Sequence, residues 1–190
     1  PVTDAHADGD GLTLAQLCHA TITTSDNTAA NLILASFGGP EALTTFARQI
    51  GDNVTRLDRN EPDLNMRLGT NSLDTTSPRA MAMSMKKVLV GDVLAPSSRK
   101  LLREWLIANT TGGKRLKAGL PVGWTIGDKT GTNKSDANDI GILDAYLGAS
   151  YGASITGGGG KFWDIPISDF CGNRWEFTDG LRLNGGDIYT

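Results

Sequence analysis

Three short polar clusters in this sequence carry residue types that are used for proton transfer in enzymes. In chain order they are Ser25-Asp26-Asn27, Glu61-Pro62-Asp63-Leu64-Asn65 and Lys129-Thr130-Gly131-Thr132. A hydroxyl, a carboxylate and an amine can each serve as a general acid or base when they are held close to a substrate. The residue types therefore indicate acid–base catalysis as the chemistry to test.

Each cluster also has an ordinary structural explanation. Asn27 is a favourable N-cap residue and could simply begin a helix at Thr28. Glu61 could be a solvated acid in a loop, and Lys129 could be a solvated lysine at the end of a strand. The order of the three clusters along one chain, with the sequence around them, favours the catalytic interpretation.

That combination resembles the class A serine β-lactamases. Ser-Asp-Asn and Lys-Thr-Gly belong to the signature shared with penicillin-binding transpeptidases, and a loop glutamate followed four residues later by asparagine separates class A enzymes from them. The resemblance runs from Pro1 to about Ile142 and includes Arg56-Leu57-Asp58-Arg59 and Asp74-Thr75-Thr76. It implies hydrolysis of a β-lactam through a covalent acyl-enzyme.

The resemblance implies a role for each cluster. Ser25 would relay a proton to the ring nitrogen, while Lys129 would keep that hydroxyl polarised and attract the substrate carboxylate. These two residues and Glu61 should then converge on one cleft, with the Ser25 hydroxyl near the Lys129 amine. The implied substrate-binding residues are Asn27, Asn65, Thr130, Gly131, Thr132 and Arg115.

Within the long loop, the resemblance makes Glu61 the base that activates water for deacylation, with Asn65 holding the same water. Arg59 and Asp74 resemble an ion pair that closes the neck of this loop, and a weak surface pair is the alternative. Arg115 stands where some class A members place an arginine that contacts the substrate carboxylate. An exposed arginine without that role is the alternative.

Two stretches depart from the family pattern. The family's nucleophile lies in a Ser-x-x-Lys element ahead of Ser25, whereas Ser97-Ser98-Arg99-Lys100 comes too late and suits a helix start capped by Ser97. Residues 143–190 are rich in glycine and aromatic residues and show neither the strand nor the helix expected there. We therefore expect a partial β-lactamase domain over 1–142, inactive without its nucleophile, and a tail over 143–190 from a shifted reading frame or a joined foreign segment. A transpeptidase-like fragment and a non-catalytic remnant are the alternatives.

The composition limits the partners. A formal net charge of -3 without a basic cluster argues against a nucleic-acid partner, and no apolar run is long enough to span a membrane, so a soluble chain is expected. No leader can be read at Pro1, and neither a metal nor another cofactor is expected. The resemblance implies a monomeric enzyme that is periplasmic or secreted when intact. It also implies that Cys18 is unpaired here, because the cysteine that forms a disulfide with it in the family lies just after the missing nucleophile.

The spacing of apolar residues predicts an α/β (α+β) fold in which helices pack on an antiparallel sheet. Thr13 and Gln16 form a predicted capping box at the first helix. A polar loop of about 25 residues is expected between Asp52 and Ser77. The other predicted elements are a helix ending at Gly38, helices from Pro40 to Gly51, from Pro78 and from Ser97 to Ile107, and strands at Trp124–Lys129 and Ile140–Leu147. The first of these strands is expected to end in a Gly-Asp-Lys-Thr-Gly turn.

Overall fold

The computed structural model describes residues 1–66, 69, 72–120, 122–134 and 136–143, and the backbone alone for 144–145, 175–176, 182–184 and 187–189. Two compact units divide the chain, Pro1–Ser84 and Met85–Thr190. Among the helices of the described part, none has the length and apolar character needed to cross a lipid bilayer.

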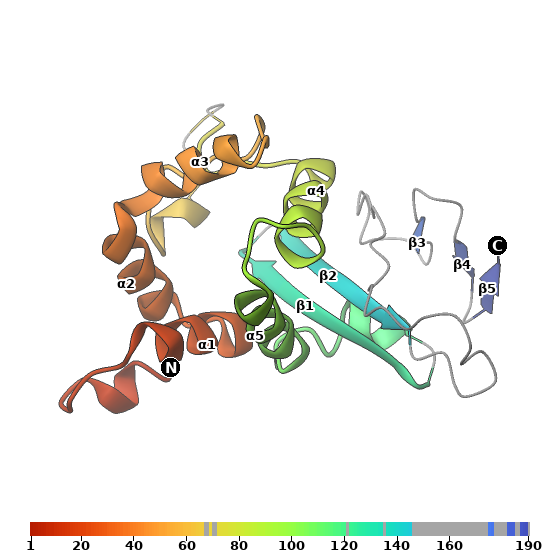
Figure 1. Ribbon diagram of the computed structural model, residues 1–190, viewed down its shortest axis with the longest axis horizontal. Helices are drawn as coiled ribbons and strands as arrows, with labels where there is room; N and C mark the ends of the chain where they lie inside the picture. The colour runs from red at the N-terminus through yellow and green to blue at the C-terminus, as the bar shows by residue number, and fades with distance from the viewer. Residues whose placement is uncertain are drawn as a thin grey trace. The chain divides into compact units, whose positions relative to one another are not determined.

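The first unit contains three helices of equal length joined by short turns (Figure 1). They are α1 (Leu14–Thr24), α2 (Asn27–Phe37) and α3 (Gly39–Gln49). The predicted capping box is present at the start of α1, where the Thr13 hydroxyl accepts from the Gln16 N–H and the Gln16 side chain accepts from the Thr13 N–H at 2.8 Å. α1 packs on α2, and α2 packs on α3.

The start of α2 differs from one of the sequence interpretations. Its N-cap is Asp26, whose carboxylate accepts from the Ala29 N–H, and Asn27 is the first helical residue. The suggestion that Asn27 caps a helix beginning at Thr28 is therefore wrong. Because Asp26 takes the capping role, the Asn27 side chain can reach the long loop instead.

The predicted loop between Asp52 and Ser77 contains one short 3-10 helix, η2 (Asp63–Asn65), in its described part. After the loop, α4 (Pro78–Leu89) begins in the first unit and ends in the second. The helix after it, α5 (Pro96–Ile107), begins at Pro96 with Ala95 as N-cap and no capping side chain. Ser97 therefore does not cap this helix. Pro96 occupies the first helical position, and the N-cap, Ala95, lies two residues before Ser97.

The second unit is built on a two-stranded antiparallel ribbon of β1 (Trp124–Thr132) and β2 (Ala137–Ala145). The Gly-Asp-Lys-Thr-Gly segment was expected to be a turn after a strand ending at Lys129. Instead it lies inside β1, since Asp128 to Thr132 pair with the first residues of β2. The chemistry-bearing residues of this segment thus stand on a strand rather than on a loop. Leu147, the expected end of β2, lies outside the described residues.

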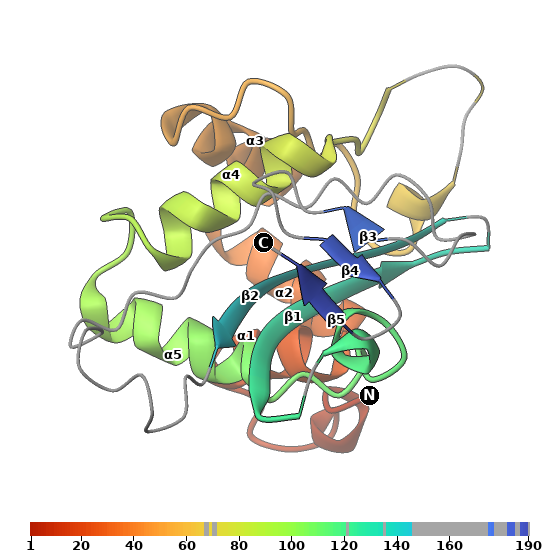
Figure 2. The same ribbon diagram turned by 90° about the vertical axis from the view of Figure 1, so that its right-hand side faces the viewer.

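The two faces of β1 have different neighbours. α5 packs on the face of Gly127, where an added Cβ would lie 2.9 Å from Leu106 Cβ. The opposite face carries Ile126, which packs with Leu116 of η3 (Leu116–Gly119). Figure 2 shows the ribbon with η3 beside β1. Because side chains alternate along a strand, Asp128 and Thr130 lie on the η3 face and Lys129 lies on the α5 face.

Three short strands belong to the remainder of the second unit, namely β3 (Trp175–Glu176), β4 (Arg182–Asn184) and β5 (Asp187–Tyr189). They pair antiparallel in the order β3-β4-β5. The four-glycine run at 157–160, the glycines at 180, 185 and 186, and Cys171 lie outside the described residues. The expectation of a foreign or frameshifted tail over 143–190 therefore stays a prediction.

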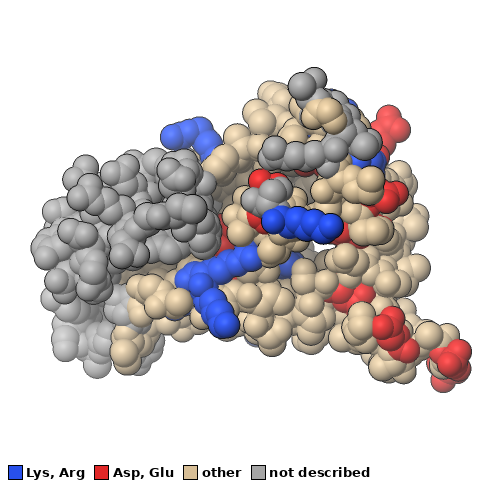
Figure 3. Space-filling view, turned by 180° about the vertical axis from the view of Figure 1, so that it is seen from behind, with Lys and Arg blue, Asp and Glu red and all other residues tan. Residues whose placement is uncertain are grey.

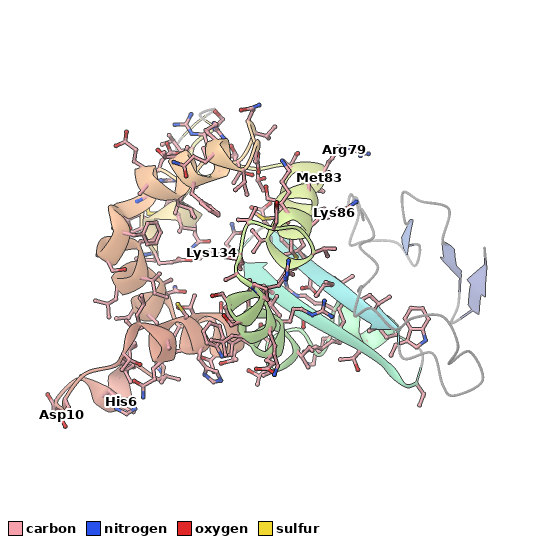
Figure 4. All side chains as sticks on the ribbon, viewed as in Figure 1. His6, Asp10, Arg79, Met83, Lys86 and Lys134 are labelled. Carbon is pink, nitrogen blue, oxygen red and sulfur yellow. The ribbon has the colours of Figure 1, made fainter. Side chains whose placement is uncertain are left out.

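On the face shown in Figure 3, basic and acidic side chains of the described part are scattered among uncharged ones. No continuous basic surface covers the described residues on this face. The N-terminal segment carries several of the acids, and Figure 4 shows His6 and Asp10 on it. Both side chains are exposed, so His6 is not part of the packed core.

Candidate active site

The Ser25-Asp26-Asn27 cluster forms the turn between α1 and α2. Ser25 ends α1 in the left-handed conformation, with φ 58° and ψ 43°. Asp26 is buried, and its carboxylate accepts from the N–H and the hydroxyl of Thr3 at 2.9 Å. Burial alone would raise the pKa of Asp26, but these hydrogen bonds and that from Ala29 lower it. The buried aspartate thus fixes the turn, and Ser25 and Asn27 on either side of it are exposed.

Glu61 is held by side chains from its own loop and from α2. The Asn65 amide donates to Glu61 Oε2 at 2.7 Å, and the Asn27 amide donates to the same oxygen at 3.4 Å. The structure therefore brings together three of the residues selected from the sequence. A carboxylate flanked by two amide groups is arranged to accept a proton from a water molecule held by the same amides.

Asn31 fixes the backbone of Glu61, and the sequence analysis missed it. Its amide donates to the Glu61 carbonyl oxygen at 2.8 Å, and its side-chain oxygen accepts from the Glu61 N–H at 3.0 Å. Asn31 follows Asn27 by one helical turn, so both side chains project from the same face of α2. That spacing is the signal in the sequence that could have identified it.

The neck of the loop is closed by Arg59 and Asp74, as expected. Arg59 Nε lies 2.6 Å from Asp74 Oδ2, and the Asp74 side chain is only 2% exposed. The other oxygen, Asp74 Oδ1, accepts from the N–H groups of Asp58 and Arg59 at 2.7 and 2.9 Å. Asp58 Oδ2 in turn accepts from the Asp74 N–H at 2.8 Å. The alternative of a weakly held surface pair does not describe this contact.

A second buried acid, Asp52, anchors the start of the same loop. Its carboxylate accepts from the N–H groups of Val54 and Thr55, from the Thr55 hydroxyl and from the Ser84 hydroxyl on α4. Burial raises the pKa of Asp52, but the donors outweigh it and hold the pKa far below the ordinary value. Both ends of the loop that carries Glu61 are therefore tied by acids with several donors each.

The Lys129 cluster lies on β1 in the second unit. Lys129 is half-buried, and its amine donates to the Thr130 carbonyl oxygen at 2.7 Å. The Thr130 side chain is buried on the opposite face of the strand, within 2.5 Å of the Thr111 hydroxyl. The expected contact between the Ser25 hydroxyl and the Lys129 amine joins the two units and stays a prediction.

Arg115 lies beside the end of β1. Its guanidinium donates to the Thr132 hydroxyl, to the Asn138 carbonyl oxygen and, at 3.1 Å, to the Gly131 carbonyl oxygen. The side chain is half-buried, and its part in binding a substrate carboxylate stays a prediction. Arg115 brings a positive charge to Gly131 and Thr132, two of the residues of β1 that were expected to bind a carboxylate.

Two Ser-x-x-Lys matches occur among the described helices, and the sequence analysis noted one of them. Ser97 lies exposed in the first turn of α5, and Lys100 pairs with Glu104 at 3.7 Å on the surface. The second match is Ser84 with Lys87 on α4. The Ser84 hydroxyl donates to Asp52 at 2.7 Å and so is engaged in the loop anchor. Neither serine has the setting of a nucleophile activated by its own lysine.

Comparison with known proteins identifies the family. The protein-family model described as "Beta-lactamase enzyme family" matches residues 1–162 of the chain. The chain belongs to this family. It is 52% identical over 139 residues to β-lactamase FAR-1 of Nocardia farcinica, a match covering 73% of the chain and 44% of that protein. It is also 52% identical over 151 residues to β-lactamase L2 of Stenotrophomonas maltophilia, covering 79% of the chain and 50% of L2.

Solved structures of class A β-lactamases match the fold. The class A β-lactamase of the last common ancestor of Gram-negative bacteria superposes with a TM-score of 0.73 at 59% identity, covering 75% of the chain and 55% of that structure. The fold is thus of the β-lactamase/transpeptidase-like type, with helices and a small antiparallel sheet. The chain spans about half the length of the curated β-lactamases it matches.

Possible metal ligands are not clustered in the described part of the chain. No group of three or more histidine, cysteine, aspartate or glutamate side chains is placed there to hold a metal ion. Cys18 is a free thiol among the described residues, and burial raises its pKa. His19 is exposed on α1.

Proposed function

We propose that this β-lactamase-family chain forms the C-terminal part of an enzyme that hydrolyses β-lactams through an acyl-enzyme. The observation that supports hydrolysis most directly is the setting of Glu61. Its side chain shares Oε2 with Asn65 and Asn27, and its backbone is held on both sides by Asn31. An enzyme that only acylates would not need a carboxylate fixed in this way, whereas deacylation needs a base that activates water.

In the acylation half-reaction, Ser25 relays a proton to the nitrogen of the opening ring. Lys129 polarises the Ser25 hydroxyl and attracts the carboxylate of the substrate. Thr130 and Thr132 hydrogen-bond the same carboxylate, and Arg115 adds its charge beside Thr132. The support for this division of labour is the position of Lys129, Thr130 and Thr132 on one strand and the contact of Arg115 with the Thr132 hydroxyl.

In the deacylation half-reaction, Glu61 takes a proton from a water molecule that Asn65 helps to hold, and the water attacks the acyl carbon. Asn27 binds the side-chain amide of the substrate near the same carboxylate. The Arg59–Asp74 pair and the donors around Asp52 keep the loop at fixed geometry, which a positioned base requires.

The nucleophile must come from sequence ahead of Ser25, because neither Ser84 nor Ser97 has the required setting. The 190-residue chain alone should therefore show no measurable turnover. Loss of a nucleophile of this kind lowers turnover by about a millionfold. The intact enzyme is expected to act as a monomer in the periplasm or outside the cell and to confer resistance to β-lactam antibiotics.

The test joins residues 1–190 behind the preceding half of a class A relative, which carries the Ser-x-x-Lys element. Hydrolysis of a chromogenic cephalosporin is then measured. Turnover by the joined protein and none by the chain alone is the expected result. If the chain alone hydrolyses the substrate, the assignment of the nucleophile is wrong, and if a folded joined protein does not, the proposed roles are wrong.

A Glu61→Gln variant of the joined protein isolates the deacylation step. The amide cannot accept the proton from water, so we expect steady-state turnover to fall by about a hundredfold or more while acylation continues. Mass spectrometry of the protein should then show the mass of the bound substrate. Asp63→Asn is the matched control, since Asp63 is an exposed acid in the same loop and should leave turnover unchanged.

A further inference from the structure

Two acids lie buried against each other on the face of the β1–β2 ribbon that carries Thr130. Asp128 of β1 is 0% exposed, and Asp139 of β2 is 4% exposed. Asp139 pairs directly with Thr130 across the ribbon, and Asp128 is two residues away on the same face. One oxygen of each acid, Oδ1, is buried without a hydrogen-bond partner among the described residues. Two buried carboxylates cannot satisfy each other, because both can only accept.

A cation and an amide donor lie against Asp128. The Lys117 amine lies 2.9 Å from Asp128 Oδ1, at ion-pair distance although not in a direction that makes a hydrogen bond. The Asn109 amide donates to Asp128 Oδ2 at 3.0 Å. Gly112 closes over the same oxygen, since a Cβ there would lie 1.6 Å from it. Asp128 is thus a charge with a cation and an amide donor at fixed positions.

The surroundings of Asp139 favour its protonated form. Burial is the largest influence and raises the pKa of Asp139 to about 7, and both the charge of Asp128 and a hydrogen bond with it act in the same direction. The Leu116 N–H, at 3.1 Å from Asp139 Oδ2, and the charge of Arg115 act in the opposite direction. A proton on Asp139 would give each unsatisfied oxygen a partner, because the new O–H can donate to Asp128.

The charge of Asp128 also sets the direction of a chain of hydrogen bonds that ends at Thr130. Because the Asn109 amide nitrogen donates to Asp128, its oxygen faces Thr111 and accepts from the Thr111 hydroxyl at 2.8 Å and the Thr111 N–H at 3.0 Å. A hydroxyl has one hydrogen. In the 2.5 Å contact between Thr111 and Thr130, the Thr130 hydroxyl is therefore the donor.

We infer that Asp128 and Asp139 hold a single proton between them and, through Asn109 and Thr111, orient the hydroxyl of Thr130 in the carboxylate-binding strand. Asp139 and Thr111 are positioning residues in this scheme. A bound carboxylate draws the Thr130 hydrogen to itself, and the Thr111 hydroxyl turns to donate to Thr130, while the Thr111 N–H keeps Asn109 satisfied. The role in substrate binding rests on the proposed function, whereas the shared proton does not.

The charged groups that face the acid pair are few. From η3 and the residue before it come Lys117 and Arg115, and from β1 and β2 come the two acids themselves. α5 covers the other face of β1, where it presents Leu106 to Gly127. Loss of the shared proton leaves two like charges in contact, which displaces Asp128 from Asn109. Asn109 then no longer holds Thr111 where its hydroxyl can donate to Thr130 in the substrate complex.

The shared proton is tested by following the side-chain carboxyl carbon of Asp139 by NMR in the 190-residue chain, with dispersed amide signals as the check on folding. We expect this carbon to titrate near pH 7, about three units above an ordinary aspartate. Titration of Asp139 near the pH of an ordinary aspartate in the folded chain would overturn the inference. This measurement needs no enzymatic activity, so it decides the matter even if the joined protein hydrolyses nothing.

The link to Thr130 is tested by the pH dependence of KM in the joined protein. We expect KM to rise about fivefold between about pH 6 and about pH 9, the effect of one lost hydrogen bond, with little change in kcat. Asp139→Asn keeps a donor toward Asp128 and has no charge, so its KM should stay constant over this range. Asp92→Asn, an exposed acid of the same unit, should keep the wild-type profile.

Thr111 decides whether the effect passes through the hydroxyl chain. Thr111→Val removes the hydroxyl between Asn109 and Thr130, so KM should lose its pH dependence, and Thr111→Ser should restore it. A profile that stays pH-dependent in Thr111→Val, or a wild-type KM that does not change with pH, would overturn the orienting role. A pH-dependent KM in Asp139→Asn would overturn the assignment to the acid pair.

Discussion

The two units of this chain bury their acids in opposite ways. In the first unit, Asp52 and Asp74 are each surrounded by N–H, hydroxyl or guanidinium donors, and the acids close the loop that carries Glu61. In the second unit, Asp128 and Asp139 lie against each other, and each has an oxygen without a donor. The first arrangement is satisfied by the fold alone, whereas the second is satisfied only when a proton is bound.

The comparison separates two ways of positioning a catalytic group. A base such as Glu61 needs one fixed geometry, and the donors around Asp52 and Asp74 supply it by tying both ends of the loop. A strand that binds an anion benefits from a nearby acid pair such as Asp128 and Asp139, because the bound proton sets the charge of the pair and the direction of the hydrogen bonds that it makes. The pKa values differ accordingly, since that of Asp52 is held far below its ordinary value and that of Asp139 is raised to about 7.

The largest effect on this comparison should come from Gly112→Val, which places a side chain where Asp128 Oδ2 now lies. Asp128 cannot move aside freely, because Asn109 and Lys117 hold it and it is fully buried. Overpacking combined with displacement of a buried charge should lower the free energy of unfolding of the second unit by about 3 to 5 kcal/mol.

Urea unfolding followed by tryptophan fluorescence measures this loss, since all four tryptophans lie after Ser84 and report on the second unit. Gly113→Ala is the matched control, because a Cβ at Gly113 meets no atom within 4 Å. Equal stability of the two variants would contradict the tight fit of Gly112 on Asp128.

A smaller effect is expected at the loop neck from Asp74→Asn. Asparagine keeps the size of the side chain and tolerates the left-handed backbone of this position, where φ is 54°. The charge opposite Arg59 is lost, however, and the hydrogen bonds to the loop backbone weaken. We expect a loss of about 2 to 3 kcal/mol, seen as faster amide hydrogen exchange in the loop and α2, with Asp63→Asn unchanged.

The sequence predicts the parts of this molecule that depend on neighbours along the chain. The capping box at Thr13, the existence and approximate extents of the helices, and the long loop follow from local patterns. The Arg59–Asp74 pair was expected from the resemblance to a family. The contacts missed from the sequence are those made across large separations, such as Asn31 with the Glu61 backbone and Asp139 with Asp128.

The wrong predictions have the same origin. A Gly-Asp-Lys-Thr-Gly segment has the composition of a turn, but pairing with Asn138–Ile142 keeps it in a strand. Asn27 and Ser97 are both good capping residues by type, yet Asp26 and the Ala95–Pro96 step take the helix starts. Local propensity is overridden where the backbone forms hydrogen bonds with a strand distant in sequence, or where an adjacent residue is the better helix start.

The pH dependence of stability should differ in sign between the units. The folded second unit holds a proton on Asp139 up to about pH 7, while an unfolded aspartate loses it near its ordinary pKa of 3.8. Stability of this unit should therefore fall as the pH rises through that range, by on the order of a few kcal/mol at most. Urea midpoints by tryptophan fluorescence should decrease between these pH values, and Asp139→Asn should remove the slope.

In the first unit the donors around Asp52 hold its pKa below the unfolded value, so the unfolded chain binds the proton more readily. Its contribution to stability is present above an ordinary aspartate pKa and is lost as the pH falls below that value. The helical signal in circular dichroism, to which α1, α2 and α3 contribute, should decrease on acidification. Asp52→Asn should reduce this acid dependence, and a first unit that gains stability in acid would contradict the comparison.

The smallest effect is expected from Lys100→Ala, which removes an ion pair that belongs to neither kind of buried site. Lys100 lies 3.7 Å from Glu104 on α5, and the two side chains are 79% and 56% exposed. Solvent and salt screen such a pair, and alanine is a favourable helix residue, so the free energy of unfolding should change by less than about 0.5 kcal/mol. Lys100 is also the lysine of the Ser97-Ser98-Arg99-Lys100 match, so the same variant in the joined protein tests whether that match takes part in catalysis. Turnover should be unchanged, since the Lys100 amine faces Glu104 and solvent. A large loss of turnover would mean that the Ser97–Lys100 segment takes part in the chemistry and that the division of roles between the two units is wrong.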